Sequence, residues 1–217
     1  MTVTPESVRA LLSSDSLGDK LRGVNQLREL EKSIAFDLVQ VPIQDKNTRV
    51  RYAAVSLMDT IGDVDLAKSL ETLRHCLQDP EYDVKSAAAD ALGGLKLTAA
   101  LPELIDLYHE TEEWLLQLSI VAALGAMQDQ RAMPLMSAAL GSSVELIKMT
   151  AVQAIGEMCD PSGIELLVTV VEEPDTQIRF RVAEALGRIG GEQATTMLKK
   201  MANDPEPRVA EQAQAFL

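Results

Sequence analysis

One helical unit is repeated along this sequence, and the repeat constrains the fold more than any other feature. Its clearest copy is TQIRFRVAEALGRIGG, residues 176–191. The apolar residues of this copy fall at offsets 0, +4, +7, +8 and +11, namely Ile178, Val182, Ala185, Leu186 and Ile189. That spacing predicts one apolar stripe along an α-helix. Gly190 and Gly191 then predict the helix end, because glycine adopts the left-handed conformation without a Cβ clash.

The same frame returns at a nearly fixed period. The residue at offset 0 of each copy, termed the anchor, is always apolar. Successive anchors are 34, 32, 31, 31 and 31 residues apart, at Val50, Val84, Leu116, Ile147, Ile178 and Val209. Periods in this range are typical of solenoids, in which each pair of helices packs only on its neighbours. We therefore predict an all-α fold, an α-solenoid of helix pairs.

The repeat predicts a single domain over residues 1–217 without an internal linker. In each repeat the anchor-bearing helix, termed helix B, comes first, and a second helix, termed helix A, follows. The first helix A is expected to turn Leu66, Leu70, Leu73 and Leu77 inward. We predict an N-terminal cap, six repeats and a truncated terminal helix, with boundaries 1–18, 19–47, 48–81, 82–112, 113–144, 145–175, 176–206 and 207–217.

Composition argues against several classes of function. The net charge is −13 and the basic residues are scattered, so the chain lacks the basic stripe of a nucleic-acid binder. The longest apolar run, near residues 166–171, is too short to cross a bilayer, and the first residues lack the pattern of a secretory leader. Cys76 and Cys159 lie in different repeats, which favours reduced thiols and a cytoplasmic location.

The frames VRYAAVSLMDTIGD, VKSAAADALGGLK and IRFRVAEALGRIGG resemble the HEAT-like repeats of the cyanobacterial phycobilin lyase family. About five recognisable copies cover the chain from residue 48 onward. The segments TPESVRALLSSDSLGDKLRGVNQLREL and RVRYAAVSLMDTIG are similar, more narrowly, to the non-bleaching B branch, which takes part in phycobilisome degradation. The resemblance implies an α-solenoid of about six HEAT-like repeats with a capping N-terminal helix.

The resemblance also implies a function. Members of this family attach, isomerise or detach open-chain tetrapyrroles, called bilins, on cysteines of phycobiliproteins. The attaching members are usually longer and work as two different subunits, so this shorter chain resembles the detaching branch. The resemblance implies phycobiliproteins such as phycocyanin or allophycocyanin as partners. It also implies that a bilin is a ligand or substrate and not a resident cofactor. The alternative is a non-catalytic adaptor that holds a protein partner, such as a protease component.

The candidate ligand-binding residues follow from the helical frame. In HEAT-like stacks the B helices line the concave side, and offsets +2 and +6 point away from the core. The +2 column contains apolar residues, and an exposed apolar patch marks a ligand or partner site. We expect four of them to bind a bilin, Tyr52, Leu118, Met149 and Phe180. Arg179 and Arg181, with Lys148 as a further choice, are expected to pair with its propionates.

Carboxylates at offset +6 are the candidate catalytic groups. Asp90 and Glu184 are expected to bind pyrrole N–H groups, and removal of a thioether needs little more than proton transfer. Arg51, in the +1 column, and Trp114, the single tryptophan, are the candidate partner-binding residues. Two histidines and two dispersed cysteines give no metal-site spacing, and the chain has no nucleophile or phosphate-loop motif.

Each of these candidates has a structural alternative. The +1 basic residues fit a ladder of ion pairs with acids of neighbouring loops, such as Asp79, Asp83 and Asp175. Helix curvature would bury the +2 apolar column, and Asp90 and Glu184 would then be solvated or ladder residues. Local packing against a loop would equally account for Trp114.

Overall fold

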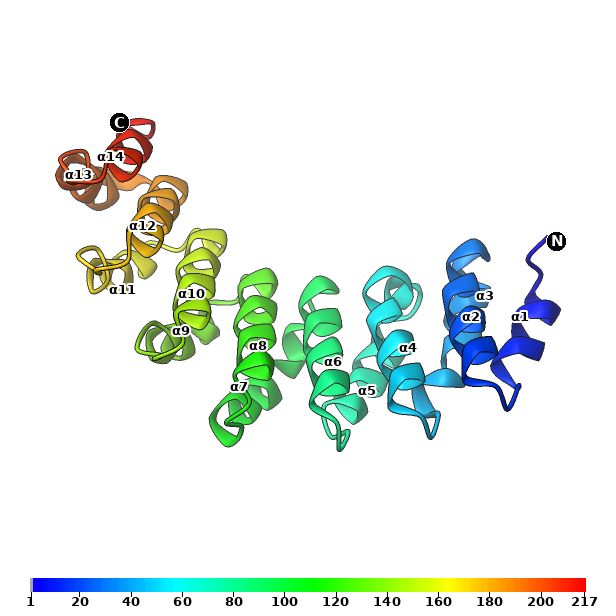
Figure 1. The fold of residues 1–217 in the computed structure, drawn as a ribbon. Helices are drawn as coiled ribbons and strands as arrows, with labels where there is room; N and C mark the ends of the chain where they lie inside the picture. The colour runs from blue at the N-terminus through cyan, green and yellow to red at the C-terminus, as the bar shows by residue number, and fades with distance from the viewer. Residues whose placement is uncertain (1) are drawn as a thin grey trace. The chain divides into compact units, whose positions relative to one another are not determined.

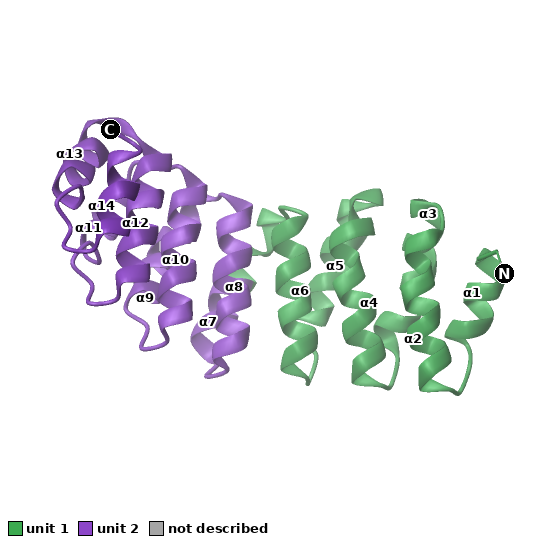
Figure 2. Ribbon diagram, turned by 45° about the horizontal axis from the view of Figure 1, so that its top comes forward, with its two compact units in different colours: residues 1–103 green, residues 104–217 purple. Residues whose placement is uncertain are grey.

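The computed structural model describes residues 2–217, and the regular secondary structure over this range is helical (Figure 1). The chain forms two compact units, one that runs to Glu103 and one that spans Leu104–Leu217 (Figure 2). We term them unit 1 and unit 2 and describe each by itself. The boundary falls inside helix α7, Leu101–Glu110.

Unit 1 begins with α1 packed on α2, and continues with B helices α4 and α6 side by side. Helix α2 packs on α4, while α3 packs on α4 and α5 on α6. Its α-helices are α1 (Pro5–Leu12), α2 (Leu17–Gln26), α3 (Lys32–Val39), α4 (Thr48–Ile61), α5 (Leu66–Cys76) and α6 (Tyr82–Gly94). Short 3₁₀ turns join them at η1 (Leu27–Glu29), η2 (Pro42–Gln44), η3 (Gly62–Val64) and η4 (Thr98–Ala100).

Unit 2 contains a row of B helices, α8, α10, α12 and α14, in which each helix packs on the next. The A helices form a second layer, in which α9 packs on α10, α11 on α12 and α13 on both α12 and α14. Their bounds are α8 (Trp114–Met127), η5 (Gln130–Ala132), α9 (Met133–Leu140), α10 (Glu145–Met158), α11 (Gly163–Val168), α12 (Thr176–Ile189), α13 (Gly191–Met201) and α14 (Pro207–Gln214).

The anchors form the core, as the repeat predicts. All six are between 0% and 1% exposed, and the residues at offsets +4 and +8 of α4, α8, α10 and α12 are buried with them. Burial of one apolar stripe per helix drives the packing of the two layers. The prediction of an all-α solenoid of helix pairs is confirmed.

Offset +5 is also buried, which the sequence pattern alone did not indicate. Its residues are Val55, Ala89, Val121, Val152 and Ala183, each 0% exposed. A B helix therefore buries a wider arc than one stripe, because it packs on its neighbouring B helix as well as on the A layer.

Close contacts between B helices in unit 2 depend on glycine at offset +9. A Cβ at Gly125 would lie 2.5 Å from the Cβ of Ala154, and a Cβ at Gly156 would lie 2.8 Å from the Cα of Ala185. Real Cβ atoms do not approach so closely, so only glycine fits here. The alanine that each glycine meets stands at offset +7 of the next helix. This contact fixes the spacing of α8, α10 and α12.

Two local expectations differ from the structure. Leu66 is 47% exposed because it is the first residue of α5, whereas Leu73 and Leu77 are buried as predicted. Helix α2 begins inside the predicted cap, at Leu17, because the Ser16 hydroxyl accepts a hydrogen bond from the Asp19 amide.

The helix ends also use the left-handed conformation more widely than the glycines suggest. At offset +12, Gly190 has φ 69°, but Gln128 and Cys159 have φ 55° and 50° at the equivalent positions. A residue with a side chain therefore ends α8 and α10. Within residues 2–217, no helix is long and apolar enough to cross a membrane.

Candidate ligand-binding face

One side of every B helix faces away from both packing layers. Since a helix turns by about 100° per residue, offsets −1, +2, +3, +6 and +10 fall within an arc of about 100° that avoids the anchors. We term these positions on α8, α10, α12 and α14 the B face of unit 2. It contains five of the predicted ligand-binding and catalytic residues, which are Leu118, Met149, Phe180, Arg181 and Glu184.

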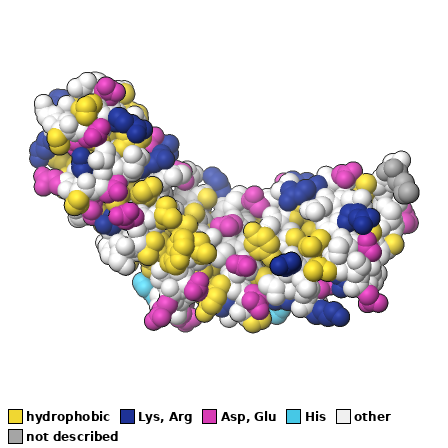
Figure 3. Space-filling model, viewed as in Figure 1, with side chains coloured by type: hydrophobic (Ala, Val, Ile, Leu, Met, Phe, Trp, Pro, Cys, Tyr) yellow, Lys and Arg dark blue, Asp and Glu magenta, His cyan; other side chains and the backbone are white. Residues whose placement is uncertain are grey.

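The α8 and α10 end of the B face is apolar. Leu115 and Leu146, both at offset −1, are 51% and 49% exposed. Leu118 and Met149 at offset +2 are half-buried beside them, so the predicted apolar column is neither fully exposed nor fully covered. Figure 3 shows hydrophobic side chains gathered over these helices. With Trp114, which is 40% exposed at the start of α8, they form what we term the apolar patch.

Sequence reasoning missed the two most exposed leucines of this patch. Leu115 and Leu146 stand three residues before Leu118 and Met149, and residues at i and i+3 lie on the same side of a helix. That spacing was the available signal.

The α12 and α14 end of the B face is charged. Arg181 donates from Nη1 to Glu184 Oε2 at 2.8 Å. The guanidinium of Arg208, at offset −1 of α14, lies 5.7 Å from the ring centre of Phe180. A shallow hollow opens between α10 and α12, lined by Gln153, Gly156, Arg181, Glu184, Ala185 and Arg188. The structure thus brings Phe180, Arg181 and Glu184 together on one face.

Arg179, only two residues from Arg181, lies on another side of α12. Its Nε and Nη2 donate to Asp204 at 2.8 Å and 3.0 Å, and Nη1 donates to the carbonyls of Glu173 and Pro174. These hydrogen bonds from Arg179 lower the pKa of the Asp204 carboxyl, and they raise the pKa of Arg179. The side chain of Arg179 is only 13% exposed. Its donors are therefore occupied, which favours the structural alternative, and its role in binding a propionate stays a prediction.

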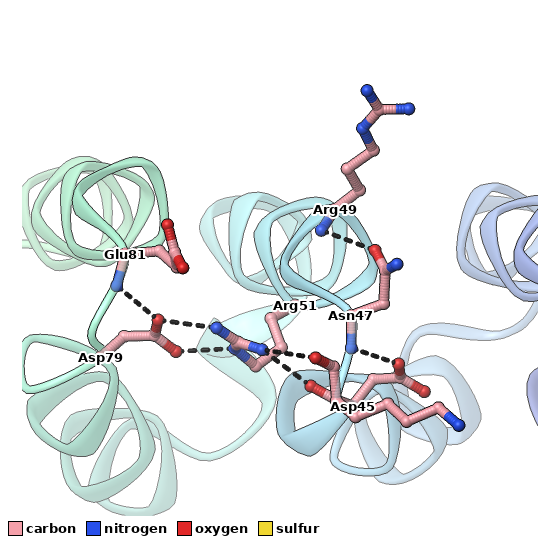
Figure 4. Close-up of polar contacts among 7 residues, drawn as sticks. Asp45, Asn47, Arg49, Arg51, Asp79 and Glu81 are labelled. Carbon is pink, nitrogen blue, oxygen red and sulfur yellow. Dashed lines mark hydrogen bonds and ion pairs between the residues drawn. The ribbon is translucent and has the colours of Figure 1, made fainter.

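Arg51 in unit 1 makes the same arrangement (Figure 4). Its Nε and Nη2 donate to Asp79 at 2.7 Å and 2.9 Å, and Nη1 donates to the carbonyls of Asp45 and Lys46. Burial by itself raises the pKa of Asp79, but the hydrogen bonds from Arg51 and the Glu81 amide outweigh it, so this pKa is lowered. This arrangement favours the structural alternative for Arg51, and its role in partner binding stays a prediction.

The +1 column is therefore largely a ladder of ion pairs, as the structural alternative proposed. Lys148 is a further member, with Nζ 2.8 Å from Glu173 Oε1. Asp79, one of the three acids named above, pairs with Arg51. Arg179 pairs with Asp204 of its own repeat. Asp175 instead caps α12, where its carboxylate accepts hydrogen bonds from the amides of Gln177 and Ile178.

The remaining candidates lie in unit 1. Tyr52 is 48% exposed on α4, and Asp90 is exposed at offset +6 of α6. They belong to the B helices of their own unit, and their roles as a bilin contact and a proton carrier stay predictions.

Neither cysteine has the surroundings of an activated nucleophile. Burial raises the pKa of the Cys76 thiol to about 12. Cys159 is exposed at the end of α10, where its Sγ lies 3.3 Å from the Gly156 carbonyl oxygen. Within residues 2–217, no group of three or more histidine, cysteine or acidic side chains is arranged to hold a metal ion.

The chemistry of the B face of unit 2 follows from these positions. An apolar surface adjoins a carboxylate and arginines, so the face suits a flat apolar molecule that carries acidic groups. The fold defines the class, an α-solenoid of helix pairs, and the B face of unit 2 is its candidate ligand or partner surface.

Comparison with known proteins identifies the family. A model of HEAT repeats matches residues 6–93, 34–125, 70–148 and 135–217, so the chain belongs to the HEAT-repeat family. A search of curated protein sequences finds no match.

Solved structures share the fold. The complex of CpcE and CpcF of phycocyanin lyase from Nostoc sp. PCC7120 is 24% identical over 100% of this chain and 96% of that chain, with a TM-score of 0.65. An archaeal HEAT-like repeats protein from Thermococcus onnurineus NA1 is 14% identical over the same shares, with a TM-score of 0.61. An engineered protein is 17% identical over 100% of this chain and 96% of that chain, with a TM-score of 0.54.

Proposed function

We propose that this protein is a phycobilisome degradation factor that binds phycobiliproteins and detaches or handles their bilin chromophores on the B face of unit 2. The main support for this proposal is the apolar patch of α8 and α10, which shares the B face with Phe180 and Arg181. A bilin is a long conjugated strip with two propionates, so it needs an extended apolar surface next to cations. Among the solved structures that share the fold, one belongs to a phycocyanin lyase, which supports the same class of substrate.

We propose a separate role for each part of the face. Leu118, Met149 and Phe180 contact the conjugated rings. In unit 1, Tyr52 is the proposed ring contact on its own B helix. Arg181 binds an acidic group of the ligand, preferably in bidentate geometry. Glu184 is a carboxylate of the B face that accepts a hydrogen bond from Arg181, and we propose that it carries the proton. Asp90 is the second proposed proton carrier.

Detachment requires no oxidant or metal. The bilin is held to its protein by a thioether, and elimination breaks the carbon–sulfur bond while a proton leaves the neighbouring carbon. The sulfur regains a proton as a free thiol, and the pigment gains a double bond. A positioned carboxylate that accepts and returns one proton meets this requirement.

A direct test mixes equimolar purified protein and phycocyanin and follows visible absorbance, then separates the mixture by gel filtration. The proposal predicts a spectral change and pigment that elutes with this protein. An unchanged spectrum, with all pigment on phycocyanin, would contradict detachment.

The second candidate is a non-catalytic adaptor, which the exposed Trp114 favours. Exposed tryptophan and leucine side chains are typical of protein interfaces. An adaptor predicts a complex with phycocyanin, or with a protease component, whose pigment spectrum stays the same. Gel filtration and absorbance on one sample therefore distinguish the two candidates.

A further inference from the structure

The arginines of unit 2 divide into two groups by their partners. Three have a carboxylate: Arg131 with Asp129, Arg179 with Asp204, and Arg181 with Glu184. Arg188 and Arg208 have no ion pair among the described residues, although the chain carries a net charge of −13. Both are exposed. An acidic protein that leaves two exposed arginines without an acid has positive charge available to a ligand.

Both of these arginines lie on the B face. Arg188 is at offset +10 of α12 and lines the hollow between α10 and α12. Arg208 is at offset −1 of α14, with its guanidinium over the ring of Phe180. Both therefore lie on the B face and not on the ladder side, where Arg179 is held by Asp204.

Arg181 is less suited to the same task. Glu184 already accepts its Nη1, so an incoming carboxylate must compete with a carboxylate of the protein. Arg188 follows Glu184 by one helical turn and Arg181 by seven residues, which is about 10 Å along the axis. Helix α12 thus carries arginines at two positions along its axis. Arg188, nearer the C-terminal end, has no ion pair among the described residues.

From this arrangement we infer that Arg188 and Arg208 bind the carboxylates of the ligand and make the B face selective for an apolar dicarboxylate. This inference rests on the proposed function and adds its specificity-determining residues. The apolar patch receives the body of the ligand, and the two arginines require that its side arms be ionised. A neutral ester of the same molecule keeps the apolar contacts but cannot form the charge-assisted hydrogen bonds.

Biliverdin and its dimethyl ester test the inference, because they differ only in the two carboxylates. Binding of each is followed by visible absorbance with the full chain. We expect biliverdin to bind at least about tenfold more tightly than the ester at low salt. We also expect this preference to shrink as salt is added, since ions screen exposed charges.

Variants test whether Arg188 and Arg208 cause the preference for biliverdin over its ester. In the double variant Arg188→Gln/Arg208→Gln, affinity for biliverdin should fall to that for the ester, and affinity for the ester should stay unchanged. Arg131→Gln is the matched control, because Arg131 is an exposed arginine of the same unit that pairs with Asp129, and it should keep the preference. Circular dichroism melts show that each variant is folded.

The possible failures are distinguishable. If the wild type binds both compounds equally, or if the double variant keeps the preference, the inference is wrong while bilin binding stands. If neither compound binds, the proposed function itself fails. Loss of affinity for the ester in the double variant would also overturn the inference, because it would show that the arginines act through packing.

Discussion

Arg179 and Arg181 show how little separates a structural residue from a functional one. Two positions on a helix turn a side chain by about 200°. Arg179 consequently faces the loop that carries Asp204, and Arg181 faces the open hollow. Sequence alone placed both near a ligand, since it could not show which acid comes within reach of which arginine. The candidate face was thus predictable, but its cations were not.

The ladder pair of Arg179 and Asp204 predicts a pH-dependent stability. Because the pKa of Asp204 is lowered in the folded state, the pair stabilises the protein above the unfolded pKa of about 3.9. That stabilisation is lost as the pH falls through the folded value. Asp204→Asn should reduce the free energy of unfolding by about 2 kcal/mol at pH 7 and weaken its dependence on pH below about 4. Urea unfolding at pH 7 and pH 3 measures both effects.

The control for this pair is Asp106→Asn, which changes an exposed aspartate of α7. Its unfolding should match that of the wild type at both pH values. An Asp204→Asn variant with wild-type stability at pH 7 would show that the ladder contributes nothing measurable.

Cys159 illustrates the cost of a side chain at a left-handed helix end. Its φ of 50° is a conformation that glycine adopts without a Cβ clash. Cys159→Gly should therefore raise the free energy of unfolding by about 1 kcal/mol. Cys159→Ser keeps the Cβ and should give no gain, so thermal melts of the two variants separate backbone strain from loss of the thiol. Equal melting temperatures for both would contradict this reading.

At the scale of the elements, the period and the apolar stripe were enough to predict which residues of the B helices form the core. Lateral packing was not predictable in the same way. Offset +5 is buried, and glycine is required at +9, because neighbouring B helices touch. The glycines at +9 in α8 and α10 are packing residues. This role depends on the distance to the neighbouring helix, which the sequence period does not reveal.

Gly156→Ala tests this packing. The added Cβ would lie 2.8 Å from the Cα of Ala185, a backbone atom, so α10 and α12 must move apart. We expect a loss of about 1–3 kcal/mol in the free energy of unfolding, despite the higher helix propensity of alanine. Chemical unfolding of the purified variant measures the change.

Gly141→Ala is the matched control for this substitution. Its Cβ would meet no atom closer than 3.4 Å, and its φ is negative. It should therefore be close to neutral. A Gly156→Ala variant as stable as Gly141→Ala would show that the B helices can separate without cost.

At the scale of the whole molecule, we propose that the B face of unit 2 binds the ligand and that the other sides of its helices hold the fold together. Two leucines at the apolar end of this face, Leu115 and Leu146, are about half exposed, so changing them should leave folding nearly intact. Their loss should instead remove the surface on which the pigment or the phycobiliprotein lies.

The most direct measurement is a titration of phycocyanin with the double variant Leu115→Asp/Leu146→Asp, followed by visible absorbance beside the wild type. The control is Val168→Asp, which changes an exposed apolar residue of unit 2 on A helix α11. We predict a spectral response with the wild type and with Val168→Asp, and a response at least about tenfold weaker with the double variant. Equal responses from the double variant and the wild type would contradict the assignment of binding to this face.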